Sequence, residues 1–181
     1  MHESSVDDLI GPGCRLLFVG INPGLWSERV GAHFARPGNR FWPALYRAGI
    51  TDRLLDMSEG ESAADRAYLI KRGIGITNFV ARPSARADEL SRDELREGAE
   101  RLTRFVAEHR PAVVACAGIT AYRAAFGRPR AKPGEQPERL GEARLWVVPN
   151  PSGLNAHETP DSLAAAYRAA ALAAGVITNR G

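Results

Sequence analysis

Two asparagines carry the most distinctive chemistry in the sequence, and each lies in a turn rich in glycine and proline. Asn22 belongs to the segment 20–24 (GINPG), and Asn150 belongs to the segment 149–154 (PNPSGL). An asparagine amide donates and accepts hydrogen bonds, proline stiffens a turn, and glycine lets a ligand approach the backbone closely. Each segment alone is also typical of an ordinary turn, so the case for a site depends on the fold bringing the two together.

Residues that could contact nucleic acid accompany these turns. Leu154 is an apolar residue in the otherwise polar segment 150–156, and it is either a wedge that opens a base stack or a side chain folded back onto the core. Arg36, Arg40 and Arg82 either contact phosphates or belong to a solvated face that is rich in arginine.

The elements that must hold these turns alternate between strand and helix. Short apolar runs predict four strands, at 15–20, 74–78, 112–117 and 145–148. Capping residues, helical spacing and breakers predict five helices. They run from Asn39 to about Gly49, from Ser62 to Arg72, from Ser91 to before Pro111, from Thr120 to Phe126, and from Thr159 through Ala170. The proline-rich stretch 127–141 is predicted to be a surface loop.

This alternation predicts an α/β fold of three layers, in which helices flank a central, mainly parallel sheet of four strands. Ligands of such sheets bind beyond the carboxyl ends of the strands. Three unusual segments, 20–24, 77–84 and 150–156, lie at such ends and are expected to meet there. The length predicts one domain over residues 1–181, with a core from about 12 to 175.

Composition restricts the class of protein. The net charge of +3 permits nucleic-acid binding without requiring it. Cys14 and Cys116 adjoin apolar runs, which favours a reducing, cytoplasmic compartment and leaves no cysteine cluster for a metal. The N-terminus is acidic and polar and no apolar run is long, so we expect neither a secretory signal nor a membrane segment.

Taken together, the segments resemble the mismatch-specific uracil/thymine DNA glycosylase family, a branch of the uracil-DNA glycosylase superfamily. The resemblance runs from about Arg15 to Tyr167, with the segments in the family's order. The matching segments are 20–24, 34–42 (FARPGNRFW), 75–78 (GITN), 82–84 (RPS), 89–90 (EL) and 149–154. The resemblance implies a uracil-DNA glycosylase-like fold and an enzyme that starts base excision repair. Such an enzyme flips uracil, or a related damaged or mismatched base, out of double-stranded DNA and hydrolyses its N-glycosidic bond. No metal or cofactor is implied, and we expect a monomer.

The resemblance also implies catalytic roles. Asn22 matches the asparagine that positions the attacking water, and Ser84 matches a hydroxyl position near that water. An amide takes up no proton near neutral pH, so chemistry slower than with a carboxylate and a preference for good leaving groups such as uracil are predicted. Asp88 and Glu89 are either surface charges ahead of a helix, or one of them supplies a carboxylate that assists catalysis. No lysine lies in the matching segments, so a monofunctional enzyme without a Schiff base is predicted.

For the base pocket, Phe34 matches the aromatic that stacks on the flipped base. Ile21 and Gly24 match positions that offer backbone groups to the pyrimidine edge, and Asn78 matches a polar position that varies between branches. Trp26 replaces a residue that is often small, so the size of the pocket is expected to differ.

The loop after the last strand is implied to face DNA through Asn150, Ser152, Gly153, Leu154 and Asn155. Leu154 matches the wedge of the family. Ala156 stands where family members can carry a basic residue that contacts the orphaned guanine, and Asn155 or His157 are the candidates to replace it.

Three alternatives remain open at this stage. The pocket could favour another deaminated base, such as hypoxanthine or xanthine, because Trp26, Asn78 and Ala156 depart from the pattern or vary within it. The protein could bind lesions without cleaving the glycosidic bond. It could also be a small-molecule α/β enzyme, although no dinucleotide fingerprint, P-loop or Ser/His/Asp arrangement can be placed in it.

Overall fold

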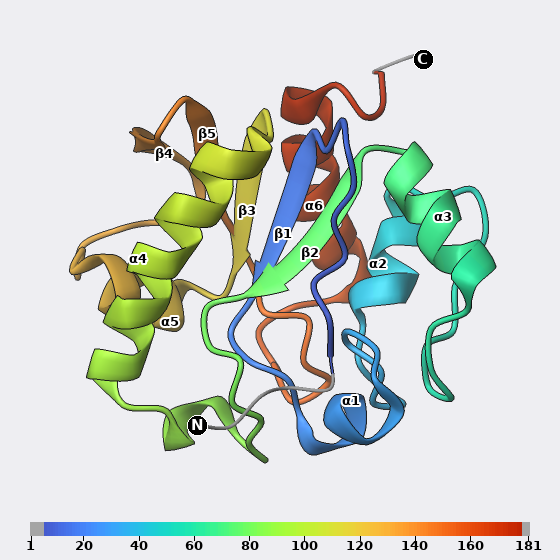
Figure 1. Cartoon of the computed structure of the whole chain (residues 1–181), viewed down its shortest axis with the longest axis horizontal. Helices are drawn as coiled ribbons and strands as arrows, with labels where there is room; N and C mark the ends of the chain where they lie inside the picture. The colour runs from blue at the N-terminus through green and yellow to red at the C-terminus, as the bar shows by residue number, and fades with distance from the viewer. Residues whose placement is uncertain (1–5, 179–181) are drawn as a thin grey trace.

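The computed structural model describes residues 6–178, which form a five-stranded sheet with helices against both faces (Figure 1). The strands are arranged in the order β2-β1-β3-β5-β4. Four of them run parallel, namely β1 (Leu16–Gly20), β2 (Ile74–Asn78), β3 (Val113–Ala117) and β5 (Ala143–Val148). The α/β class and the mainly parallel central sheet expected from the sequence are therefore confirmed.

The expectation of four strands, with a loop over 127–141, is wrong. Strand β4 (Gly134–Leu140) pairs antiparallel with β5 at the edge of the sheet. Most of its side chains are exposed, and Pro137 lies where the register shifts, so β4 has no apolar run to mark it in the sequence. An edge strand tolerates such a sequence because only one of its sides forms ladder hydrogen bonds.

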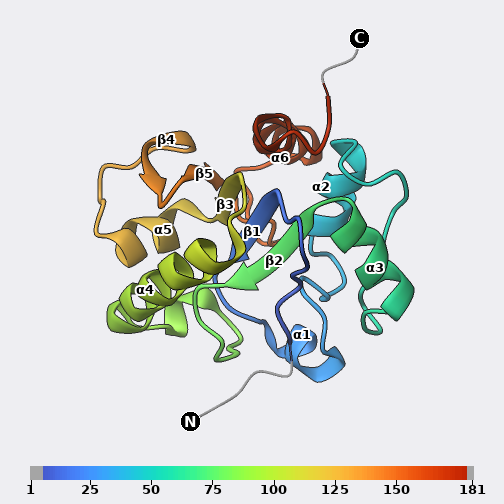
Figure 2. The same cartoon turned by 45° about the horizontal axis from the view of Figure 1, so that its top comes forward.

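Alternate side chains of the parallel strands fill two cores on opposite faces of the sheet. In β1, Leu16 and Phe18 belong to one core and Leu17 and Val19 to the other. Continuous apolar strands of this kind are expected when both faces of a sheet are covered. One face is covered by α2 (Phe41–Arg47), α3 (Ala63–Lys71) and α6 (Pro160–Ala174), and the other by α4 (Arg92–His109) and α5 (Ile119–Phe126) (Figure 2).

The predicted capping residues act largely as expected. The side chains of Ser62, Ser91 and Thr159 each accept a hydrogen bond from the backbone N–H three residues further on. At α2 the cap comes from one residue upstream of the N-cap, since Oδ1 of Asn39 accepts from the N–H of Phe41 at 2.9 Å. The six-residue helix α1 (Leu25–Val30) was not predicted, because so short a segment shows no helical repeat.

The carboxyl ends of the four parallel strands meet at one edge of the sheet, the lower edge in Figure 1. The chain leaves that edge in the loops that follow Gly20, Asn78 and Val148, and α1 lies beneath it. Within residues 6–178 no helix is both long and apolar enough to cross a membrane, and no three His, Cys, Asp or Glu side chains are grouped as metal ligands.

Candidate active site

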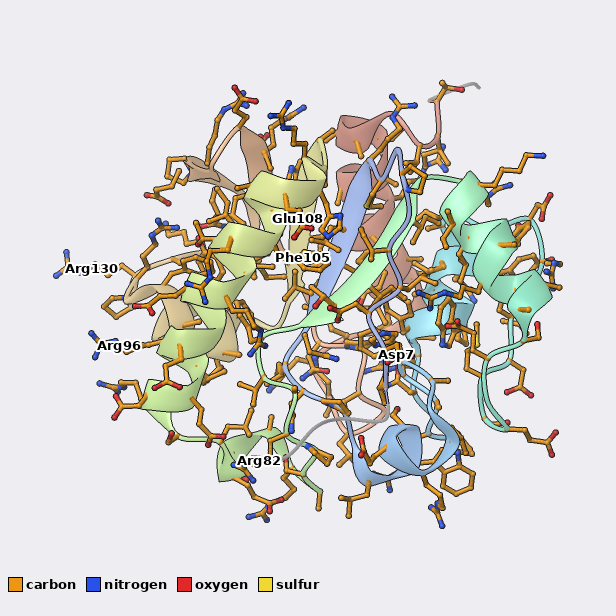
Figure 3. The ribbon with its side chains drawn as sticks, viewed as in Figure 1. Asp7, Arg82, Arg96, Phe105, Glu108 and Arg130 are labelled. Carbon is orange, nitrogen blue, oxygen red and sulfur yellow. The ribbon has the colours of Figure 1, made fainter. Side chains whose placement is uncertain are left out.

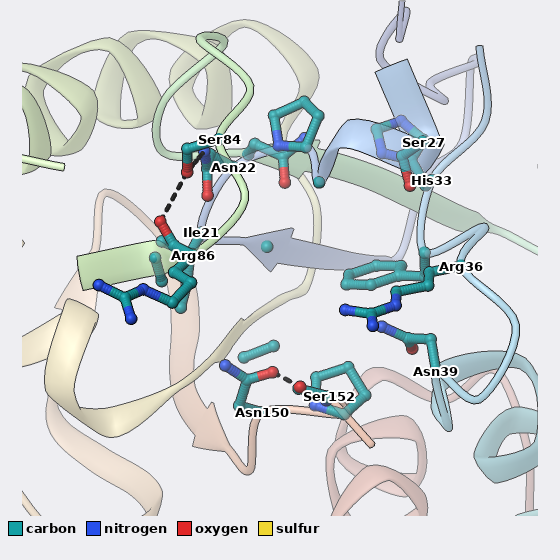
Figure 4. Close-up of a pocket in the computed structure, with 18 of the residues that line it drawn as sticks. Ile21, Asn22, Ser27, His33, Arg36, Asn39, Ser84, Arg86, Asn150 and Ser152 are labelled. Atoms are coloured by element: carbon teal, nitrogen blue, oxygen red, sulfur yellow. Dashed lines mark hydrogen bonds between the residues drawn. The ribbon is translucent and has the colours of Figure 1, made fainter. Parts of the chain in front are cut away.

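A cavity of about 350 Å³ opens at this edge, which is an ordinary size for a small-molecule site. Figure 4 shows Asn22 and Ser84 on one wall, Asn150 and Ser152 on another, and His33 on a third. The three segments expected to meet beyond the strands therefore do so. The predicted site residues that line the cavity are Ile21, Asn22, Gly24, Phe34, Asn78, Ser84, Asp88, Asn150, Ser152 and Leu154.

The side-chain amide of Asn22 is held in one orientation. Its nitrogen Nδ2 donates to the backbone carbonyl of Arg82 and to Oγ of Ser84, each at 2.8 Å. The Ser84 hydroxyl donates in turn to the carbonyl of Arg86 at 2.7 Å, so a lone pair of Oγ faces Asn22. Both amide hydrogens are thereby used, and Oδ1 of Asn22 accepts no hydrogen bond from residues 6–178. An amide oxygen fixed in this way is an acceptor that can orient a water molecule.

Backbone hydrogen bonds join the two loops that carry this pair. The N–H of Ser84 donates to the carbonyl of Pro23 at 3.1 Å, and the N–H of Val80 donates to the carbonyl of Ile21 at 3.0 Å. The Ile21 carbonyl is therefore occupied within the protein. Gly24 is the N-cap of α1 and has no side chain, so the N-cap residue itself offers no side-chain acceptor to the first N–H groups of that helix.

An aromatic ring and an unpaired amide form another part of the cavity. Phe34 stacks on Phe41 with ring centroids 4.0 Å apart and 20° between the planes, so one face of Phe34 is covered. Its φ of 51° lies in the left-handed region, which is rare for a bulky residue. The side-chain amide of Asn78 has no hydrogen-bond partner in the described part of the chain. Gly20 makes room for both, because a Cβ there would meet Oδ1 of Asn78 and the ring of Phe34.

His33 also lines the cavity and is buried, although no pattern in the amino-acid sequence predicts its burial. Its Nε2 lies 2.8 Å from the carbonyl oxygen of Asp7, so Nε2 carries the proton. Nδ1 is then an acceptor, and it has no partner among the residues that the structure describes. Burial lowers the pKa of His33 below 6.5, against the opposing effects of the Asp7 carbonyl and the Asp8 carboxylate. His33 is therefore neutral near pH 7.

Of the two carboxylates considered for catalysis, Asp88 lines the cavity and Glu89 does not. Asp88 pairs with Arg86 at 3.1 Å, and both side chains are more than two-thirds exposed. Glu89 accepts a hydrogen bond from the N–H of Arg86 at 2.7 Å. Among the described residues, neither carboxylate is hydrogen-bonded to Asn22 or Ser84.

The loop after β5 is folded by its own side chains. Oδ1 of Asn150 accepts from the N–H of Ser152 at 2.9 Å, and Nδ2 of Asn155 donates to the carbonyl of Asn150 at 3.1 Å. Gly153 packs against a backbone carbonyl of the segment before α2, where a Cβ would not fit. Leu154 is 79% exposed, so the interpretation that it folds back onto the core is wrong.

The three candidate arginines have different surroundings. Arg36 is exposed and lines the cavity. Arg82, at the lower edge in Figure 3, forms two hydrogen bonds of 2.9 Å with Glu94, and this pairing lowers the pKa of Glu94 to about 2. For Arg40 the expectation of a phosphate contact or a solvated side chain is wrong. Its guanidinium donates inward to backbone carbonyls of the loop after β5.

Trp26 does not line the cavity, contrary to the expectation that it changes the size of the pocket. Its Nε1 donates to the carbonyl of Ser58 at 2.8 Å, and the ring packs against the core. The next residue, Ser27, is the one that lines the cavity. It is buried, and its Oγ accepts from the N–H of Ala35 at 3.0 Å.

Two comparisons with known proteins bear on the family and on the fold. A family model described as the uracil DNA glycosylase superfamily matches residues 8–171. The fold is similar to the solution NMR structure of a candidate uracil DNA glycosylase from Methanosarcina acetivorans, with a TM-score of 0.59 and 17% sequence identity over 90% of this chain and 94% of that one. The structural likeness supports the fold, and the family match spans nearly the whole chain. The chain therefore belongs to the uracil DNA glycosylase superfamily, which implies the hydrolase activity of a DNA glycosylase in DNA repair.

Proposed function

We propose that the protein is a monofunctional glycosylase that removes uracil from double-stranded DNA, and mismatched uracil most readily. The observation that carries this proposal is the fixed amide of Asn22. Its free oxygen belongs to a cavity that also holds the ring of Phe34 and the unpaired amide of Asn78. Excision of a flipped base needs an acceptor that orients the attacking water, a surface on which the base stacks, and a polar group that hydrogen-bonds to the base. Asn22, Phe34 and Asn78 offer these three in turn.

The target nucleotide must leave the stacked duplex to reach this cavity. The exposed side chain of Leu154 is the apolar group available to fill the space that the nucleotide leaves. Phe34 offers its uncovered face to the extruded base, and stacking of this kind is worth about 1–3 kcal/mol per base.

Uracil matches the polar groups of the cavity. Its edge presents a carbonyl acceptor next to an N–H donor, and one amide, that of Asn78, can meet both. Neutral His33 adds a second acceptor, Nδ1, which suits a base that carries an N–H donor and does not suit one that carries only acceptors.

In the reaction, water held by Oδ1 of Asn22 attacks C1′ of the sugar as the bond between C1′ and N1 breaks. The bonding electron pair leaves with the base as an anion, and the proton of the water passes to solvent. The first N–H groups of α1, which follow Gly24, are dipoles of the sign that stabilises such an anion. Because Asn22 orients water and does not take up its proton, the best leaving groups are removed fastest.

Preference for a mismatch follows here from the cost of flipping. Ala156 offers no side-chain donor to an orphaned guanine. A mispaired uracil costs less to extrude than a paired one, so G·U substrates should be processed faster than A·U substrates for that reason alone.

The test is single-turnover base release from duplexes that are identical except at the target base pair. The target base is uracil opposite guanine, uracil opposite adenine, hypoxanthine or xanthine. Uracil released fastest, with G·U ahead of A·U, supports the proposal. Faster release of hypoxanthine or xanthine would move the substrate assignment to that base. Tight binding of the duplexes without release of any base would mark the protein as a lesion binder.

A further inference from the structure

One arginine connects the base pocket to the loop that carries the wedge. Arg40 is the N-cap of α2, and its backbone N–H donates to the carbonyl of Pro151 at 2.9 Å. Its Nη1 donates to the carbonyl of Glu158 at 2.7 Å, and its Nη2 donates to the carbonyls of Ser152 and Asn155, each at 2.8 Å. Four hydrogen bonds from this residue therefore reach one loop, at points on both sides of Leu154.

The loop has hydrogen bonds within itself but no helix or strand, so bonds from outside it add to its order. Residues 149–159 form turns and irregular backbone between β5 and α6. At the start of the loop, the Tyr167 hydroxyl donates to the carbonyl of Pro149 at 3.1 Å. Beyond it, the carbonyls of Asn155 and Glu158 meet the guanidinium of Arg40.

Two of the three guanidinium nitrogens of Arg40, Nε and Nη2, have no N–H group left to bind a phosphate. Its Nε is buried and has no hydrogen-bond partner among the described residues, so solvent does not reach this nitrogen. Nη2 spends both of its hydrogens on loop carbonyls. An arginine that binds phosphate in the complex keeps its N–H donors exposed to solvent in the free protein, and Arg40 does not.

Arg40 also lies next to the wall that holds the base. Asn39 and Arg36, just before it, line the cavity, and Phe41, just after it, is the ring on which Phe34 stacks. The stacking surface and the wedge are thereby joined through a single residue.

We propose that Arg40 is a positioning residue that holds the loop 150–158, with Leu154 extended, before DNA arrives, and so promotes duplex opening rather than bond cleavage. The proposal rests on the proposed excision of a flipped base. A loop that is ordered in advance loses less conformational freedom on binding, which lowers the free energy needed to insert the wedge. Because the planar fork of arginine reaches several carbonyls at fixed angles, lysine at this position would keep the charge and lose the clamp.

The first experiment compares the wild type with Arg40→Lys and Arg168→Lys. Arg168 is a matched control, since its Nη1 donates to the carbonyl of Ala48 at 2.8 Å and so also bonds a backbone carbonyl, away from the wedge loop. Hydrogen exchange in the free proteins is expected to accelerate at the amides of residues 152–158 in Arg40→Lys only. Unchanged exchange in that loop would overturn the proposal, whether or not the protein releases uracil.

The second experiment measures single-turnover uracil release from a G·U duplex and from an oligonucleotide in which the uracil is already unpaired in a loop. Loss of hydrogen bonds from a charged group predicts a decrease of about 10- to 100-fold on the duplex in Arg40→Lys. The unpaired substrate should lose less than about threefold, because flipping is already done. Equal losses on both substrates would assign Arg40 to the chemistry or to the general fold, and would contradict the proposal.

Two further comparisons separate the outcomes. The double variant Arg40→Lys/Leu154→Ala should be no slower on the duplex than Leu154→Ala alone, because an absent wedge needs no positioning, and additive losses would contradict this. Arg40→Gln should leave the salt dependence of DNA affinity unchanged, whereas a slope smaller by about 0.9 would identify a phosphate contact instead. If the wild type releases no uracil, the proposed function fails, and hydrogen exchange still decides the role of Arg40.

Discussion

Replacing Ser84 by alanine tests whether the orientation of Asn22 matters. The substitution removes one of the two acceptors that hold Nδ2, and leaves the carbonyl of Arg82 to fix the amide alone. The amide can then rotate and turn Oδ1 away from the cavity. One such hydrogen bond contributes about 1 kcal/mol, and 1.36 kcal/mol corresponds to tenfold in rate, so the rate of base release should fall about three- to tenfold.

The assay is single-turnover release of uracil from a G·U duplex with enzyme in excess, together with a direct measurement of duplex affinity. Because Ser84 is 6% exposed, the affinity should change little. Ser84→Thr keeps the hydroxyl and should retain most of the rate. An unchanged rate in Ser84→Ala would refute the argument that Ser84 orients Asn22, and a loss as large as that of Asn22→Ala would show that Ser84 acts on the water directly.

Three other expectations follow from the same cavity. Gly20→Ala should abolish base release while the protein stays folded by circular dichroism, because its methyl group would occupy the space next to Asn78 and Phe34; normal release would contradict this use of the glycine. Phe34→Leu should weaken binding of a duplex with a flipped base by about 1–3 kcal/mol, measured with a non-cleavable uracil analogue, and an unchanged affinity would argue against stacking. The lowered pKa of His33 means that the unfolded chain binds a proton more readily than the folded one, so this contribution to stability is complete above about pH 6.5 and is lost as the pH falls. Denaturant midpoints at pH 7.5 and 5.5 should therefore differ more in the wild type than in His33→Gln, and equal differences would contradict the assignment.

The fold was predictable where burial leaves a pattern. The strands β1 and β3 are continuous apolar runs because both of their faces are covered, and the helix starts at Ser62, Ser91 and Thr159 carry capping side chains. Strand β4 was missed because an exposed edge strand needs no apolar residues and can contain proline.

The site was predictable to the extent that turns after parallel strands converge. That rule predicts that the segments carrying Asn22, Ser84 and Asn150 meet, and the three residues line one cavity. It could not reveal the burial of His33, since a single histidine shows no periodicity. Nor could it reveal that Arg40 points inward, because its acceptors are backbone carbonyls more than a hundred residues away, which leave no trace in side-chain types.

The most direct test of the central claim is single-turnover release of uracil from a G·U duplex by the wild type and by Asn22→Ala, with duplex affinity measured for both. Asn22 is expected to act on the reacting water and not on binding. The account predicts release by the wild type, a loss of about 10²- to 10³-fold in the variant, and similar affinities. Release that survives in Asn22→Ala, or no release by a wild-type protein that still binds the duplex, would contradict it.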